Sequence, residues 1–373
     1  MKILILNWRD VLHPRAGGAE MRLHKIYAPL TKLGHEVVLY SCAFHGCKKT
    51  ENVDGIEVHR RGNDLTFAPL CTLNLRRWVK RHRPDIVVEE LNKLPFYSPL
   101  VYKGPLMVQM AHLWRTAIFK EARFPVAFVV WFFEQTIGWF YKKCWFSVYS
   151  TCTQKDLKAF GAQDERNRLI YCGGDLSAYV PGTVEREPFI LWISRLQKYK
   201  GPTDAVEILE KLASEFPELK LVIVGSGPFQ PQLEAFIAKK GMRDKVRLTG
   251  FISEEEKINL LQRAAVHLQS SYKEGWGLSV IEANSCGCPV VANDTTGLRD
   301  SCRDNETGLL YKHCDIEDGA SKVRKMLTDD ALRQRLVEKG YEWAGGFSWE
   351  RNTREILDYL QEIIDASRGE SKL

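Results

Sequence analysis

Two glutamates, Glu274 and Glu282, flank a glycine-containing loop in the second half of the chain. Gly275 and Gly277 can adopt backbone angles that other residues avoid, and a helix is expected to begin near Leu278. A glycine-rich loop leading into a helix presents free N–H groups and the positive end of the helix dipole, which suits a phosphate group. Carboxylates would repel a phosphate, so both glutamates should instead accept hydrogen bonds from hydroxyls on either side of it. That arrangement describes a nucleotide sugar; the alternative is a solvated loop beside an exposed helix glutamate.

A pair of cations, Arg195 and Lys200, follows the apolar run of residues 189–193. The run is predicted to be a buried parallel strand, and ligands of open parallel sheets bind at the carboxyl ends of strands. Arginine offers a planar fork and lysine a mobile point charge, so the two together can hold a diphosphate. Solvated loop charges are the alternative.

In the first half, the glycine pair Gly17-Gly18 lies between a short apolar run, residues 2–8, and a helical pattern that starts near Met21. Strand, glycines and helix form the phosphate-binding arrangement of Rossmann-like folds, although the G-x-G-x-x-G of a dinucleotide site is absent. His112 directly follows another predicted strand, residues 105–110, and is therefore a candidate for the same edge of a sheet.

Strands alternate with helices along the whole chain, which predicts an α/β fold built on doubly wound parallel sheets. A length of 373 residues predicts two domains of ordinary size. The polar, proline-bounded segment 180–188 is the expected linker between them.

Charge is unevenly distributed. Residues 1–182 carry 26 Lys and Arg against 16 Asp and Glu, whereas the remainder carries 27 against 31. A basic half could face anionic lipid, nucleic acid or an acidic substrate. The ten cysteines lack zinc-like spacing, and the N-terminus runs into a strand pattern without a signal peptide. A reduced, cytoplasmic protein is therefore expected.

The segment 124–143 is strongly apolar and aromatic. Its uninterrupted apolar run of about ten residues is short of the roughly 20 that a transmembrane helix needs, and Glu134-Gln135 interrupts it. Two interpretations remain: a buried helix of the first domain, or an interfacial segment with aromatic anchors and flanking lysines at Lys120 and Lys142-Lys143. With the basic first half, the segment favours an acceptor at a membrane surface.

Glu274-x7-Glu282 resembles the E-x7-E signature of the retaining family 4 glycosyltransferases of GT-B fold, also called glycosyl transferase group 1. The following segment, residues 284–292, is similar to that family's A-x-A-x-G-x-P-V-V-A continuation. Arg195-x4-Lys200 resembles its G-R-L-x-x-x-K-G motif, with Ser194 in place of the glycine. Gly17-Gly18 is similar to the glycine pair of its P-x-x-G-G-x-E motif.

The resemblance implies a GT-B architecture, in which two Rossmann-like domains with doubly wound parallel sheets face each other across a cleft. The expected parts are an N-terminal acceptor-binding domain (1–182), a C-terminal nucleotide-sugar-binding domain (183–350) and a C-terminal helix (351–373) that returns to the N-terminal domain.

The family's residue roles carry over to matching positions. His112 and Glu274 are expected to be catalytic, with His112 at the sugar rim and Glu274 on the sugar hydroxyls. The donor diphosphate is expected to contact Gly17, Gly18, Arg195, Lys200, Gly277, Leu278 and Ser279. The nucleoside is expected to contact Gly227, Phe251, Ile252 and Glu282. Residues that could line the acceptor side are Glu89, Glu90, Asn92 and Lys93.

No D-x-D pair, which a metal-dependent GT-A transferase would use, occurs in the chain. The missing pair and the retention that the resemblance implies together predict a metal-independent, retaining transfer of a hexose from a nucleoside diphosphate sugar, with UDP favoured and GDP-mannose next. The acceptor is a hydroxyl, either lipid-linked or on another glycan precursor at the cytoplasmic membrane face, and no cofactor is expected. Alternatives are a GT-B epimerase or phosphorylase, a non-catalytic sugar-nucleotide-binding protein, and a basic RNA-binding protein, for which no RNA motif is present.

Overall fold

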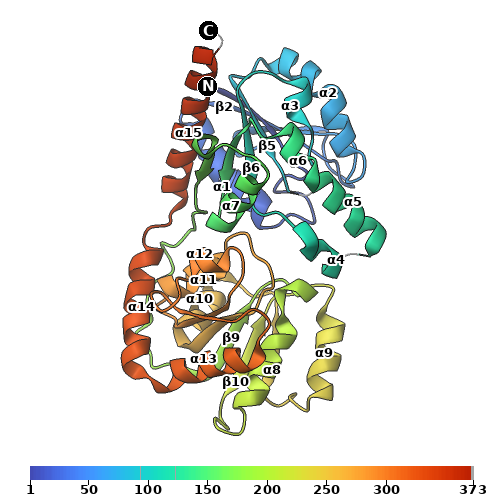
Figure 1. Ribbon diagram of the computed structural model, residues 1–373. Coiled ribbons are helices and arrows are strands. Elements are labelled where there is room, and N and C mark those ends of the chain that lie inside the picture. The colour runs from blue at the N-terminus through green and yellow to red at the C-terminus, as the bar shows by residue number, and fades with distance from the viewer. Residues whose placement is uncertain (93, 122, 371–373) are drawn as a thin grey trace. The chain divides into compact units, whose positions relative to one another are not determined.

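The computed structural model describes residues 1–92, 94–121 and 123–370. Its contacts divide the chain into two compact units (Figure 1). Unit 1 comprises Met1–Gly173 and the C-terminal helix α15 (Trp349–Glu370), and unit 2 comprises Gly174–Ser348. Unit 2 thus begins at Gly174, earlier than the boundary expected after residue 182. One reason is that Tyr179 is buried in the same core cluster of unit 2 as Phe189.

Unit 1 is built on an eight-stranded sheet in the order β3-β4-β2-β1-β5-β6-β7-β8, parallel except where β3 pairs with β4. Its strands are β1 (Lys2–Leu6), β2 (Glu36–Ser41), β3 (Thr50–Val53), β4 (Ile56–Arg60), β5 (Ile86–Glu90), β6 (Leu106–Met110), β7 (Trp145–Val148) and β8 (Asn167–Leu169). Its other helices are α1 (Gly18–Lys32), α2 (Phe67–His82), α3 (Ser98–Val101), α4 (Ile118–Glu121), α5 (Phe124–Gln135), α6 (Ile137–Phe140) and α7 (Thr151–Ala159), with single turns at Arg115–Ala117 and Asp164–Arg166.

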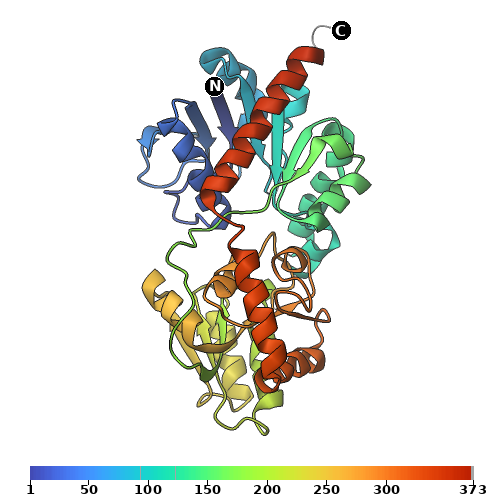
Figure 2. The ribbon, with the colours of Figure 1, turned by 90° about the vertical axis from the view of Figure 1, so that its left-hand side faces the viewer.

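Helices cover both faces of this sheet. Phe67 and Trp78 of α2 and Ile137 of α6 pack in one buried cluster against one face. Helices α1 and α15 pack in a separate cluster against the other face, and Figure 2 shows α15 running across the sheet. The Tyr359 hydroxyl of α15 donates a hydrogen bond to the Phe146 carbonyl at 3.0 Å, which ties the C-terminal helix to β7.

Unit 2 is built on a six-stranded, fully parallel sheet in the order β11-β10-β9-β12-β13-β14. Its strands are β9 (Glu187–Ile193), β10 (Lys220–Val224), β11 (Val246–Gly250), β12 (Ala264–Gln269), β13 (Val290–Asn293) and β14 (Leu309–Tyr311). Its helices are α8 (Pro202–Leu212), α9 (Gln230–Lys239), α10 (Glu254–Arg263), α11 (Leu278–Ser285), α12 (Leu298–Ser301), α13 (Ile316–Thr328) and α14 (Asp330–Ala344), with a single turn at Lys198–Lys200. Because α8, α9 and α13 pack on one face and α10 and α11 on the other, both predicted doubly wound α/β sheets are confirmed.

The antiparallel strand β3 was not expected from the sequence. It joins β4 through Asp54 and Gly55, which both have positive φ, at 50° and 93°. An Asp-Gly pair with this geometry is a strong signal for a two-residue hairpin turn. The residues of β3 are polar and only partly buried, as an edge strand allows, so they lack the apolar run that identifies the other strands.

The segment 124–143 forms helices α5 and α6, and for α5 the interpretation as a buried helix is wrong. Of the residues of α5, only Ala127 and Glu134 are buried. Among the described helices, none combines the length and apolar character that crossing a bilayer requires.

The imidazole of His267 lies fully buried in β12. Its Nδ1 donates to the Leu191 carbonyl at 3.2 Å, and burial lowers its pKa from 6.5 to about 4. The contribution of neutral His267 to the free energy of unfolding is therefore complete above pH 6.5. It is lost as the pH falls towards 4, by up to about 3 kcal/mol, because the unfolded chain takes up a proton that the folded chain does not. We expect the thermal midpoint of the unaltered chain to fall between pH 7.5 and pH 4.5, and that of His267→Gln to fall less. Thermal unfolding of both proteins at pH 7.5, 5.5 and 4.5 measures this difference. An unchanged pH dependence in the variant would contradict this assignment.

Candidate functional site

The two cations that follow β9 lie in a loop held by backbone contacts. Ser194 N–H donates to the Val224 carbonyl at 3.1 Å, and Leu196 N–H donates to the Ser226 carbonyl at 2.9 Å. A Cβ atom at Gly227 would collide with the Leu196 carbonyl oxygen, so glycine is required for the loops after β9 and β10 to approach this closely. Gly227 therefore has a packing role next to the proposed nucleoside site.

The two cations differ in their surroundings. Arg195 is exposed and forms no ion pair with any residue that the structure describes. Lys200, in contrast, is 8% exposed, and its ammonium forms an ion pair with Oε1 of Glu274. The sequence predicted both residues at the carboxyl end of β9, and only the structure shows that one of them is already engaged.

Glu274 is held from one side only. Besides Lys200, its Oε1 accepts from the Ser271 hydroxyl at 3.0 Å and from Nε2 of Gln269 at 3.3 Å. Its Oε2 receives no hydrogen bond from the described residues. The carboxylate is thus oriented by protein donors at one oxygen and has the other available for hydroxyl groups of a ligand.

The loop that carries Glu274 is fixed by a further layer of contacts. Asn293 Nδ2 donates to the Ser271 carbonyl at 3.0 Å, and the Thr295 hydroxyl donates to the Tyr272 carbonyl at 2.8 Å. The Tyr272 hydroxyl donates to Asp204 at 2.6 Å. Burial raises the pKa of Asp204 to about 6, which the Tyr272 hydrogen bond partly offsets. The sequence reasoning missed the pairing of Asp204 with Tyr272, because no spacing signal joins α8 to this loop.

Helix α11 begins immediately after the loop, as the sequence predicted. Its N-cap is Gly277, which has φ of 88° and no side-chain cap. The backbone N–H groups of Leu278 and Ser279 donate no hydrogen bond to the described part of the chain. The Ser279 hydroxyl accepts from Gln269 Nε2 at 3.3 Å, so Gln269 links the helix start to Glu274. An uncapped helix N-terminus with free N–H groups is suited to bind a phosphate.

Glu282 lies one turn further along α11, where burial raises the pKa of its carboxyl. The ammonium group of Lys257 in α10 lies 3.1 Å from Glu282 Oε1 and opposes that shift. The sequence reasoning missed Lys257, because the start of α10 carried only the signal of an acidic first helical turn. The pair forms a second carboxylate–lysine arrangement near the start of α11.

The remaining predicted nucleoside contacts lie after β11. Phe251 is 90% exposed, whereas Ile252 is partly buried against the cluster formed with α10 and α11. The exposed phenyl ring of Phe251 therefore has little contact with its own unit.

In unit 1, Gly17 is the N-cap of α1, and Gly18 is its first residue. The Gly17 N–H already donates to the Glu20 carboxylate at 2.7 Å. His112 lies two residues beyond β6, half-buried, with its ring packed edge-on against Trp114 at a centroid distance of 5.1 Å. These three residues therefore lie at the strand and helix ends where the sequence placed them.

The carboxylates expected on the acceptor side are buried. Glu89 accepts hydrogen bonds from the Tyr141 hydroxyl at 2.7 Å and from the Phe96 N–H at 2.9 Å, so it positions the loop after β5. Glu90 lies 3.5 Å from Arg22, and burial raises its pKa to about 7. Neither faces solvent, so the expectation that they line an acceptor site is wrong. Asn92 donates to Asn7 at 2.9 Å, and Lys93 lies outside the described residues.

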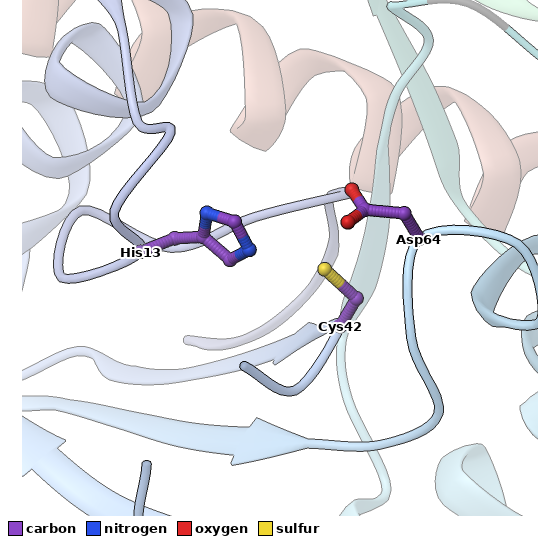
Figure 3. Close-up of side chains that lie close together, drawn as sticks. All are labelled: His13, Cys42 and Asp64. Carbon is purple, nitrogen blue, oxygen red and sulfur yellow. The ribbon is translucent and has the colours of Figure 1, made fainter. Parts of the chain in front are cut away.

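One cluster in unit 1 has the composition of a metal site. His13, Cys42 and Asp64 bring one nitrogen, one sulfur and one oxygen within 4.8 Å of one another (Figure 3). However, the Asp64 carboxylate pairs with Arg9 at 2.8 Å and with Arg15. His13 Nδ1 also accepts the Arg15 N–H at 3.0 Å, which leaves the neutral ring with its proton on Nε2. Two guanidinium groups and a protonated ring nitrogen would oppose a cation, so the cluster is better explained as an arginine–carboxylate contact that holds this loop.

The chain matches two protein families. Residues 16–178 match the family described as Glycosyltransferase Family 4, and residues 179–343 match the family described as Glycosyl transferases group 1. One curated relative is the D-inositol 3-phosphate glycosyltransferase of Thermobifida fusca, which is 28% identical over 228 residues, covering 56% of this chain and 52% of that protein. The chain thus spans about half the length of the curated relatives it matches.

Solved structures share the fold along nearly the whole chain. Sucrose-phosphate synthase from Thermosynechococcus elongatus aligns with a TM-score of 0.80 at 20% identity and covers 98% of this chain and 99% of that one. HepE from Anabaena, solved in complex with UDP and glucose, aligns with a TM-score of 0.73 at 18% identity and covers 97% of this chain and 100% of that one. The two family matches, the two parallel-sheet units and these neighbours agree: the chain belongs to the family 4, group 1 glycosyltransferases of GT-B fold.

Proposed function

We propose that the protein transfers a hexose from a nucleoside diphosphate sugar to a hydroxyl group, with retention at the anomeric carbon and without a metal ion. A UDP-sugar is favoured as the donor and GDP-mannose comes next. The observation that carries the proposal is the arrangement in unit 2. The positive groups Arg195, Lys200 and the α11 N-terminus accompany Glu274, a carboxylate with one oxygen available to a ligand.

The positive groups of unit 2 would bind the phosphates of the donor. Arg195, Lys200 and the N–H groups of Leu278 and Ser279 would neutralise the diphosphate as it leaves, the task that a divalent cation has in other transferases. Lys200 would shift from Glu274 towards the phosphates or bridge the two.

The carboxylates would accept hydrogen bonds from the hydroxyls of the donor. Glu274 Oε2 would accept from hydroxyls of the transferred sugar. Glu282, which pairs with Lys257, would accept from the ribose, while Gly227, Phe251 and Ile252 would border the base. From unit 1, we assign His112 to the sugar rim and Gly17 and Gly18 to the donor diphosphate.

In the proposed reaction, the acceptor oxygen forms a bond to the anomeric carbon on the face from which the phosphate oxygen departs. The acceptor's proton passes to the leaving phosphate, so no enzymic nucleophile is needed. The acceptor is a hydroxyl of a lipid-linked molecule or of another glycan precursor, and the reaction would take place at the cytoplasmic face of a membrane. Relatives support the general chemistry: HepE was solved with UDP-glucose, and the Thermobifida protein is named a glycosyltransferase.

The proposal is tested by incubating the purified protein with UDP- and GDP-sugars, with and without a membrane extract and EDTA, and analysing products by mass spectrometry and NMR. We expect acceptor-dependent release of the nucleoside diphosphate, a product that keeps the donor's anomeric configuration, and no loss with EDTA. An isomerised sugar nucleotide formed without acceptor would identify an epimerase, and phosphate-dependent release of a sugar phosphate would identify a phosphorylase. Binding without turnover across the whole panel would identify a non-catalytic binding protein.

A further inference from the structure

Helix α5 is apolar around its whole circumference but is mostly exposed. A helix of this kind is normally enclosed by protein or lipid, and a cluster of large exposed apolar side chains marks an interaction site. Six exposed side chains of α5 and α6 define what we call the α5–α6 patch: Phe124, Val126, Phe128, Phe132, Trp139 and Phe140.

The patch is built on fixed supports. The buried Glu134 carboxylate accepts the backbone N–H of Arg115 at 2.7 Å, which anchors α5 to the turn before α4. Tyr97, before α3, shares a hydrogen bond with the Thr136 hydroxyl at 2.9 Å, and its ring packs edge-on against Phe140 at 5.5 Å. Its apolar side chains are therefore presented outward by a packed framework.

Cations flank the patch along the chain. Arg123 immediately precedes α5, Lys142 and Lys143 follow α6, and all three are exposed. Helix α2 packs on the same face of the sheet as α6, and α2, α3, α6 and α5 follow one another along one side of unit 1 in Figure 1. The exposed residues of α2 include four cations, Arg76, Arg77, Lys80 and Arg81.

We propose that the α5–α6 patch binds the interfacial region of an anionic lipid bilayer, with its aromatic side chains among the acyl-chain ends and the flanking cations on lipid phosphates. Aromatic residues beside Lys and Arg are the signature of helices that lie in this interface. The twelve residues of α5 extend about 18 Å, too short to cross the roughly 30 Å hydrocarbon core.

Charge complementarity favours lipid over a second copy of the chain as the occupant. A symmetric contact between two such patches would bring the same cations of both copies together, and like charges facing each other oppose association. An anionic bilayer instead satisfies the apolar patch and its cations at once. The inference rests on the proposed function only in that a membrane surface would present a lipid-linked acceptor; binding itself does not require catalysis.

The test is co-sedimentation of the full chain with vesicles of phosphatidylcholine alone and of phosphatidylcholine with phosphatidylglycerol. We expect binding to the anionic vesicles that weakens as salt is raised. Phe128→Ser/Phe132→Ser/Trp139→Ser should weaken it at least about tenfold through lost apolar burial. Lys142→Glu/Lys143→Glu should weaken it at least about tenfold through lost attraction to the lipid phosphates.

The matched control is Lys32→Glu/Leu33→Ser, which changes an exposed cation and an exposed apolar residue at the end of α1, on the opposite face of the sheet. It should bind vesicles like the unaltered chain. Absence of binding by the unaltered chain, or equal binding by the patch variants, would overturn the proposal. So would patch-dependent dimers in light scattering without vesicle binding, which would assign the patch to a second copy. UDP affinity, measured by calorimetry on the same samples, should stay unchanged in every variant, so a failure of the proposed function is seen separately from a failure of lipid binding.

Discussion

Glu274→Gln is expected to lower kcat for hexose transfer about a thousandfold, a loss of about 4 kcal/mol in transition-state stabilisation. Positive charge develops on the sugar ring as the bond to the phosphate breaks, and a carboxylate that holds the ring hydroxyls stabilises that charge. The amide keeps the shape of the side chain and loses the negative charge. The measurement is the rate of nucleoside diphosphate release in the presence of acceptor.

The fold should survive this substitution. Within the described chain, the hydrogen bonds of the Glu274 side chain all reach Oε1, and the carbonyl oxygen of glutamine can still accept from Lys200, Ser271 and Gln269. We therefore expect the variant to fold and its affinity for UDP to change little, while the unfolding free energy falls by about 2 kcal/mol or less because the largely buried Lys200 ammonium loses its counter-charge. Glu218→Gln, an exposed glutamate of the same unit, is the control and should leave the rate unaltered. Transfer by Glu274→Gln at the rate of the unaltered chain would refute the role of this carboxylate.

The sequence located the candidate site because open parallel sheets bind ligands where strands end. Arg195 and Lys200 could be placed after β9, and the start of α11 at Leu278 could be read from the glycine loop before it. These inferences need only local sequence patterns. An apolar run and the polar residues after it indicate the end of a strand, and the last glycine of the loop indicates where the helix begins.

Contacts between distant segments could not be inferred in this way. Lys257 reaches Glu282 from another helix, and Tyr272 reaches Asp204 across the sheet edge. Glu89 illustrates the opposite error: it ends a strand as a ligand residue would, yet its hydrogen bonds are to the protein. Whether a polar group at a strand end faces a ligand or supports a loop depends on the packing of the next segments.

The same limit applies to α5. Its apolar composition is compatible with a buried core helix and with a lipid-facing one, because periodicity reports only which sides of a helix are apolar. For a helix that is apolar on all sides, only the arrangement of its neighbours decides, and here they leave most of it exposed.

The second large effect is expected at Lys200, and Arg195 provides the comparison. Arg195→Gln should lower kcat/KM by about a hundredfold and leave the thermal midpoint unchanged, since the exposed guanidinium has no ion pair in the described chain. Lys200→Met should lower kcat/KM at least as much. It should also cost about 2 kcal/mol of unfolding free energy, because the largely buried Glu274 carboxylate loses its counter-charge. Enzyme kinetics with a UDP-sugar and urea unfolding measure the two effects separately.

The double variant Lys200→Met/Glu274→Gln separates the structural from the catalytic part of this effect. Removing the unpaired negative charge should restore most of the unfolding free energy lost in Lys200→Met. The activity of the double variant should be no higher than that of the less active single variant. Such non-additivity in stability is expected for two residues in direct contact. If the double variant were instead as unstable as the sum of its parts, the Lys200–Glu274 ion pair would not be what holds the loop. If Lys200→Met kept full activity, the diphosphate would have to be neutralised by Arg195 and the α11 N-terminus alone.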